Sequence, residues 1–124
     1  MELKEGLSYT AEVVVSDVNL AKHWGSGALD VFATPAMVAL MENAAMKAVA
    51  PALPEGSDTV GTVVNVNHVK ATGMGETVCA TAVLKEIDGR KLVFDVMASD
   101  SKGEIGIGTH TRFIVDREKF LSRL

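Results

Sequence analysis

Two polar residues, Glu42 and His68, stand where the surrounding pattern favours apolar side chains. His68 continues a row formed by Val64 and Val66 on one face of a predicted strand. A buried carboxylate without a partner costs several kcal/mol, so Glu42 must find a partner, take up a proton or face a cavity. The helical neighbours on its own face are all apolar, namely Pro35, Val38, Ala39, Ala45, Met46 and Val49.

Each of these residues also has a purely structural interpretation. Glu42 could bond a backbone amide or a buried water, and a lone histidine in an apolar row is commonly a core residue with its hydrogen bonds satisfied. A carboxylate and an imidazole that share one region nevertheless provide the groups for general acid–base chemistry. The coincidence of the two anomalies therefore favours a functional site.

Thr34 is a third candidate, because its hydroxyl is predicted to lie at the N-terminus of the helix that carries Glu42. Backbone N–H groups and the helix dipole favour a developing oxyanion at such a position. Thr34 also suits the N-cap, with Pro35 as the first helical residue. The sequence therefore predicts a residue that both caps the helix and takes part in chemistry.

The helix that positions Thr34 and Glu42 is predicted from Pro35 to about Ala50, because Pro51 and Pro54 prevent its continuation. Apolar residues cover almost its whole circumference, which indicates a helix wrapped by a sheet. A strand is predicted before it, from Tyr9 to Val15, followed by a loop from Asp17 to Asp30.

Four strands are predicted after the helix, and a short helix ends the chain. The strands extend over about 59–71, 76–87, 90–99 and 104–115, and the terminal helix over 117–124. Asp88-Gly89 predicts a two-residue hairpin turn with Glu86 opposite Lys91, and turns at Gly73 to Gly75 and at 101–103 predict an antiparallel meander. Gly106 and Gly108, on one strand face, predict a close approach of the helix.

Composition excludes several classes of protein. The chain has 124 residues, 48% hydrophobic and 23% charged, which predicts a single folded domain over residues 1–124. A net charge of −4 without a basic stripe argues against nucleic-acid binding. No metal-ligand spacing is present, and the single Cys79 is predicted to be a small buried core residue. Without a signal sequence or an apolar run long enough to span a membrane, we expect a cytoplasmic protein.

Three segments resemble the fluoroacetyl-CoA thioesterase family. The first runs from Val31 to Glu42 and reads VFATPAMVALME, the second is VNHVKAT at 66–72, and the third is GIGTHTR at 106–112. The resemblance covers most of the chain, from about Val31 to Phe120, and the order of threonine, glutamate and histidine is its most specific part.

This resemblance implies an α+β hotdog fold, in which a five-stranded antiparallel sheet wraps one long helix. It implies a homodimer, with a tetramer left open, and CoA thioester hydrolysis by Thr34, Glu42 and His68 without a cofactor beyond the CoA of the substrate. It also suggests that Gly61 and Arg112 contact the substrate. The segment before Val31 is shorter than in the family, so the family's aromatic lid is missing or different here, and a generic small or medium acyl-CoA is the expected substrate. Trp24 is either a lid or a packing residue.

Two alternatives remain at this point. A non-catalytic domain that binds or senses acyl-CoA could use the same cavity. A dehydratase acting on acyl thioesters could use the same fold, although the different Asp/His motif of such enzymes is not found. The polar pair Glu42 and His68 favours hydrolysis, because an acyl-binding cavity alone would favour an apolar lining.

Overall fold

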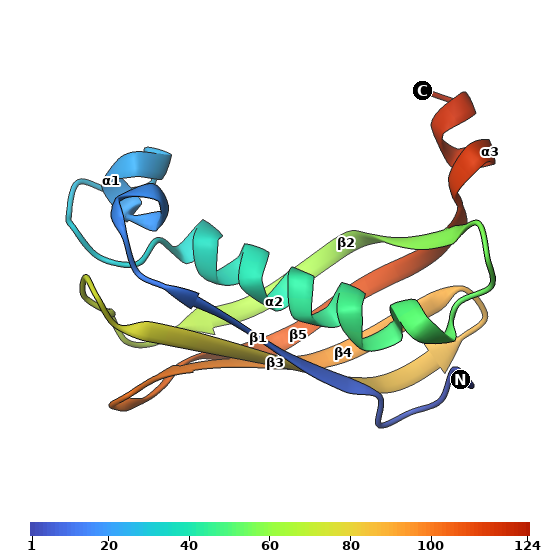
Figure 1. The fold of residues 1–124 in the computed structure, drawn as a ribbon, viewed down its shortest axis with the longest axis horizontal. Coiled ribbons are helices and arrows are strands. Elements are labelled where there is room, and N and C mark those ends of the chain that lie inside the picture. The colour runs from blue at the N-terminus through green and yellow to red at the C-terminus, as the bar shows by residue number, and fades with distance from the viewer.

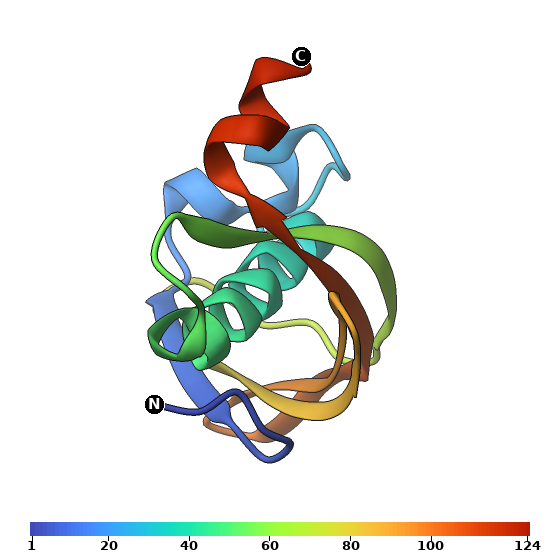
Figure 2. The same cartoon turned by 90° about the vertical axis from the view of Figure 1, so that its right-hand side faces the viewer.

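The computed structural model describes all residues from 1 to 124 and shows one antiparallel sheet curved around a single long helix (Figure 1). The central helix α2 spans Thr34–Val49, and the five strands are β1 Ser8–Val14, β2 Ser57–His68, β3 Thr77–Asp88, β4 Lys91–Asp100 and β5 Gly103–Asp116. The view along the helix shows the sheet curling around it (Figure 2). The predicted hotdog architecture is confirmed. None of the helices is long and apolar enough to cross a membrane.

Helix α2 and the sheet pack through small side chains. The buried face of α2 includes Ala44, Ala45 and Ala48, and Ala80, Ala82 and Ala98 lie buried on the facing side of β3 and β4. Larger side chains from both layers fill the space around these contacts, chiefly Met37, Met41, Leu84, Leu92, Phe94 and Ile105. Burial alternates along β3 and β4, as expected for strands with one face on the core.

The strand order is β1-β3-β4-β5-β2, which corrects the predicted meander. Only β3, β4 and β5 follow one another as neighbours. Strand β2 pairs with β5, from Ser57 opposite Asp116 to His68 opposite Gly106, so Gly73 and Gly75 belong to a crossover connection rather than a hairpin turn. β1 and β2 are therefore the two edges of the sheet.

The hairpin between β3 and β4 also differs from its prediction. Asp88 pairs with Lys91, and Glu86 pairs with Val93 rather than with Lys91. The turn consists of Gly89, with a φ of 61°, and Arg90, one residue later than predicted. A bulge at Lys85 then shifts the register again.

Short helices replace part of the loop predicted for residues 17–30. They are a 3-10 helix, η1, at Asp17–Asn19 and helix α1 at Ala21–Trp24. A second 3-10 helix, η2, at Ala50–Ala52 follows α2, and α3 at Arg117–Ser122 ends the chain and extends away from the sheet (Figure 1).

Cys79 is only half-buried and faces away from α2, which corrects its prediction as a core residue. Its position between the buried Val78 and Ala80 places it on the opposite face of β3. Burial, and the neighbouring Glu12 carboxylate at 3.7 Å, raise the pKa of the thiol. Cys79 is therefore held as a thiol and is poorly suited to be a nucleophile.

Gly106 and Gly108 of β5 serve different contacts. A Cβ on Gly106 would overlap the thioether of Met37 on α2, as predicted for a close approach of the helix. A Cβ on Gly108 would instead overlap the backbone of β2 at Asn65 and Val66. Gly108 thus permits β2 to curl over β5 and bring its C-terminal end, with His68, towards α2.

Replacing Gly108 by Ala is expected to lower the free energy of unfolding by about 3 kcal/mol, because backbone cannot move aside as a flexible side chain can. Chemical denaturation measures the change. Gly73→Ala is the matched control, because Gly73 has no atom within 4 Å of a new Cβ. Equal stability of the two variants would contradict the role of Gly108 in letting β2 curl over β5.

Candidate active site

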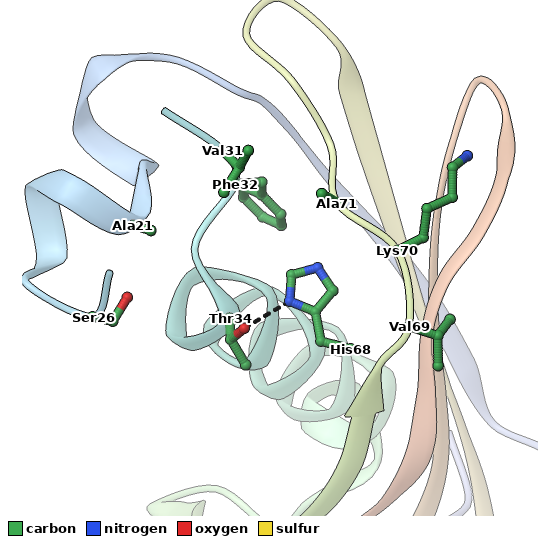
Figure 3. Close-up of a pocket in the computed structure, with 9 residues that line it drawn as sticks. All are labelled: Ala21, Ser26, Val31, Phe32, Thr34, His68, Val69, Lys70 and Ala71. Carbon is green, nitrogen blue, oxygen red and sulfur yellow. Dashed lines mark hydrogen bonds between the residues drawn. The ribbon is translucent and has the colours of Figure 1, made fainter. Parts of the chain in front are cut away.

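The hydroxyl of Thr34 and the imidazole of His68 are in direct contact. Thr34 Oγ1 lies 2.7 Å from His68 Nδ1 (Figure 3). Thr34 is the first residue of α2, and the N-cap position belongs to Ala33, which has extended backbone angles and no side-chain cap bond. The prediction of Thr34 as N-cap is therefore wrong, and its hydroxyl is free to bond the histidine.

His68 ends β2 and is held in a form suited to accepting a proton. Burial lowers the pKa of its imidazole, and the nearby backbone of Lys70 opposes this effect. Its Nε2 is buried and has no hydrogen-bond partner within the chain. A neutral imidazole whose Nδ1 accepts the Thr34 hydroxyl proton must carry its own proton on Nε2.

A cavity of about 300 Å³ surrounds this pair at the N-terminus of α2 (Figure 3). The first turn of a helix leaves backbone N–H groups without intrahelical acceptors, and these favour negative charge. The wall combines the α1 segment, the residues before α2 and the connection after β2, with Ala21, Ser26, Val31, Phe32, Val69, Lys70 and Ala71. The arrangement can activate a hydroxyl and stabilise an oxyanion in one place.

Glu42 lies in a second cluster, away from Thr34 and His68. Its Oε2 is 3.7 Å from Nη1 of Arg112, and a Cβ on Gly61 would lie 2.6 Å from the same oxygen. The Glu42 side chain is 40% exposed in the single chain. The face of α2 around it is thus less covered than the apolar pattern predicted, and Ala39 and Met46 are exposed as well.

Arg112 is buried and fixed from several sides. Its Nε donates to Thr59 Oγ1 at 2.8 Å, and its Nη2 donates to Thr59 O at 2.9 Å. Nη1 lies 3.2 Å from Nε2 of His110. Burial lowers the pKa of the guanidinium while Glu42 raises it, and arginine nonetheless keeps its charge in proteins. The cluster therefore presents a fixed cation to Glu42.

Gly61 has no room for a side chain. A Cβ there would meet the Glu42 carboxylate, His110 Cε1 at 3.1 Å and Arg112 Nη1 at 3.2 Å. Gly61 pairs with Arg112 across β2 and β5, next to a bulge at Thr62. The absence of a side chain thus lets the carboxylate lie directly against β2.

Trp24 lies outside the cavity of Thr34 and His68. Its indole N–H donates to Val18 O at 2.8 Å, and its ring lines a separate cavity of about 320 Å³. The other lining residues are Val13, Val18, Asn19, Phe32, Ala36, Ala39, Leu40 and Asn43. Phe32 lines both cavities, so it forms a wall between them.

The sequence reasoning missed His110 and Thr59 as members of the Glu42 cluster. The signal was present, because His110 and Arg112 share one face of β5 by period-two alternation with Gly106, which faces the helix. Two polar residues on a face expected to be apolar are the same signal that made Glu42 and His68 candidates.

Stability is expected to fall as the pH drops below 6.5, because the pKa of His68 is lowered in the folded protein and unfolding restores it. In that range the unfolded chain binds a proton that the folded chain does not, at most about 1.4 kcal/mol per pH unit. Denaturation between pH 7.5 and 5 measures the slope. His68→Gln should reduce the slope to the part contributed by His110, whose pKa is also lowered in the folded protein. His23→Gln, at an exposed position, is the control, and an unchanged slope in His68→Gln would contradict the assignment.

Comparison with known proteins shows the family to which the chain belongs. The family model described as fluoroacetyl-CoA-specific thioesterase matches residues 15–118. The fluoroacetyl-CoA thioesterase of Streptantibioticus cattleyicolor is 45% identical over 95 residues, covering 77% of this chain and 68% of that protein.

Solved structures extend the likeness over the whole fold. A structure of a fluoroacetyl-CoA thioesterase superposes with a TM-score of 0.92 at 37% identity, over 99% of this chain and 96% of that one. A thioesterase superfamily member from Thermus thermophilus reaches a TM-score of 0.89 at 28% identity, over 97% and 89% of the two chains. The chain therefore belongs to the fluoroacetyl-CoA-specific thioesterase family of hotdog-fold acyl-CoA thioesterases.

Proposed function

We propose that the protein hydrolyses a small or medium acyl-CoA to the free acid and CoA, at a site formed by Thr34 and His68 of one protomer and Glu42 of another. The contact between Thr34 Oγ1 and His68 Nδ1 carries this proposal. A variant of a fluoroacetyl-CoA-specific thioesterase crystallised with fluoroacetate and CoA supports an acyl-CoA substrate; it superposes with a TM-score of 0.89 at 40% identity, over 95% of this chain and 99% of that one.

The two clusters are too far apart to act together within one chain. Thr34 and Glu42 are eight residues apart on α2, a rise of roughly 12 Å. Gly61, against which Glu42 lies, and His68 are seven residues apart on β2, roughly 23 Å along the strand. A single carbonyl group next to His68 is therefore out of reach of the same chain's Glu42.

The free edge of β2 provides a way to bring the clusters together. β2 pairs on one side only, and from Thr59 to Asn67 it carries no charged side chain. Val63 and Val64 are 54% and 40% exposed. Soluble monomers commonly protect such an edge with charges, so this one is suited to pairing with a second copy. The other edge, β1, is shorter and carries Glu12.

The register of such a pairing follows from the positions of the two clusters. An antiparallel β2–β2 pair is related by a two-fold axis, as most homodimers are. In such a pair the axis passes through a residue that faces its own copy, here Asn65. His68 lies three residues after Asn65, and Gly61 lies four before it, one of which the bulge at Thr62 takes up. His68 therefore lies opposite the partner's Gly61, against which the partner's Glu42 lies. Each dimer then contains two equivalent sites, and each site takes its Thr34 and its Glu42 from different chains.

In the proposed reaction, His68 accepts the proton of Thr34 through Nδ1. The hydroxyl oxygen, or a water molecule in its place, attacks the thioester carbonyl, and the first turn of α2 stabilises the negative charge on the carbonyl oxygen. The imidazolium of His68 then returns the proton to the departing CoA sulfur. Attack by Thr34 leaves an acyl ester on its oxygen, which water then cleaves: the water oxygen bonds the carbonyl carbon, and its proton passes through His68 to the Thr34 oxygen as the free acid leaves. The partner's Glu42 stabilises the imidazolium or acts as base toward water.

Incubation with a panel of acyl-CoAs and a thiol-detecting dye tests the function. We expect CoA release with wild type, and a loss of roughly 100-fold or more in kcat for Thr34→Ala and for Glu42→Gln, because each removes a group that handles the proton or the charge. Circular dichroism checks that both variants fold. Binding without release of CoA would indicate a sensing domain, and near wild-type turnover of a variant would remove its residue from the mechanism.

Mixing the two inactive variants tests whether the site is shared. A hybrid of one Thr34→Ala protomer and one Glu42→Gln protomer has one site with both defects and one site with neither. After unfolding and refolding together in equal amounts, half of the dimers are hybrids, so roughly a quarter of the wild-type activity should return. Recovery of no activity, with hybrids verified by mass spectrometry, would show that Thr34 and Glu42 act within one chain.

A further inference from the structure

We infer that His110 is a positioning residue for the hydrolysis proposed above, and that it acts as a neutral hydrogen-bond acceptor that fixes Arg112 against Glu42. The inference rests on the proposed function for its catalytic consequence. Its structural part rests on the contacts of His110 alone.

Both ring nitrogens of His110 are engaged, and their partners determine which one carries the proton. Nδ1 lies 2.8 Å from the carbonyl oxygen of Val63, which can only accept, so Nδ1 carries the hydrogen. Nε2 is then a lone pair, to which Arg112 Nη1 donates at 3.2 Å. The ring is 1% exposed and stacks on Phe94 with centroids 6.3 Å apart. His110 is therefore held as one neutral tautomer.

These two bonds connect the elements that surround the Glu42 carboxylate. Val63 follows the bulge at Thr62, and Gly61 precedes it, so the bond to Val63 fixes the part of β2 that Glu42 lies against. Arg112 Nη1, the nitrogen bonded to His110, is also the nitrogen 3.7 Å from Glu42. Thr59 holds the other guanidinium nitrogens. His110 thus fixes Nη1, the one Arg112 nitrogen that Thr59 does not bind.

A neutral acceptor suits this position better than a charged one. A carboxylate in place of His110 would neutralise Arg112 and weaken its attraction for Glu42. An apolar side chain would leave Nη1 without its buried acceptor, which is costly for a charged donor. A neutral imidazole fixes the guanidinium and leaves its charge available to Glu42.

Protonation of His110 would prevent it from fixing the guanidinium of Arg112. Burial lowers the pKa of His110, and so does the nearby charge of Arg112, whereas the Val63 bond and Glu42 raise it. Arg112 on β5 and Glu42 on α2 are the charged groups that act on it. The imidazolium has no lone pair for Arg112 and repels its charge. Activity should therefore fall on the acid side as His110 takes up a proton.

Three substitutions separate the two bonds of His110. In His110→Gln, Oε1 can occupy the place of Nε2 and accept from Arg112. In His110→Asn, the amide nitrogen can occupy the place of Nδ1 and donate to Val63 O. His110→Phe keeps the stack on Phe94 and loses both bonds. The Gln variant therefore isolates the contact that the inference depends on.

We expect kcat to fall tenfold or more in His110→Asn and His110→Phe, with KM within a few-fold of wild type. His110→Gln should retain most of kcat and lose the contribution of His110 to the acid side of the pH profile. If the role of His110 were only structural, the variants would differ in stability but share one kcat and one pH profile once folded, which would overturn the inference.

Nuclear magnetic resonance of labelled histidine provides a test that needs no turnover. We expect His110 at pH 7 as the neutral Nδ1–H tautomer, and a higher pKa for His110 in Arg112→Gln, where the neighbouring cation is removed. A charged His110 or the Nε2–H tautomer at pH 7 would overturn the inference even in an active enzyme. The expected resonances in a protein that hydrolyses no acyl-CoA would instead overturn the proposed function and leave the contact intact.

Discussion

The close contact between α2 and the sheet determines where every residue of the site lies. Alanines of the helix face alanines of β3 and β4, and Gly106 of β5 accommodates Met37. Small side chains on both surfaces bring the two backbones close, so residues on one flank of α2 reach the strand that curls over it. Thr34 meets the end of β2 and Glu42 meets its first half. A thicker layer of side chains between α2 and the sheet would separate Thr34 from the end of β2 and Glu42 from its first half.

The same contact divides the chemistry into two halves. At the N-terminus of α2, the hydroxyl of Thr34 lies beside the imidazole of His68 from β2. About two turns further along the helix, the carboxylate of Glu42 lies beside the buried guanidinium of Arg112 from β5. Neither cluster is complete alone, because the first contains the hydroxyl that can lose a proton and the second contains the fixed charges. An uncharged strand edge lies between them. A single chain thus contains all the groups of the proposed site, but it holds them in two separate places.

Local patterns predicted much of this structure, because they depend on neighbours in the sequence. The prolines that end α2, the alternation along β3 and β4, and the misplaced polarity of Glu42 and His68 were all visible in the chain. Thr34 illustrates the limit. Its hydroxyl had two possible partners, a backbone N–H nearby and an imidazole 34 positions away, and only the fold determines which one it bonds.

Long-range pairing accounts for most of what could not be predicted. Glycines such as Gly73 and Gly75 suit a hairpin and a crossover equally well, so the position of β2 beside β5 was not evident. A bulge, as at Lys85, leaves no signal in residue type and shifts every pair beyond it. His110 was missed for a related reason, since its importance comes from Arg112 and from Val63 on another strand.

The strand order also has a consequence for folding. β3, β4 and β5 can assemble from neighbouring hairpins, whereas β2 must wait for β5, the last strand to be synthesised, and Ser57 must find Asp116. Closing such long loops costs chain entropy before any contact compensates for it, and folds dominated by distant pairings form slowly. The Glu42 carboxylate, Arg112 and the free edge of β2 therefore come together late, so a half-folded chain lacks the proposed site.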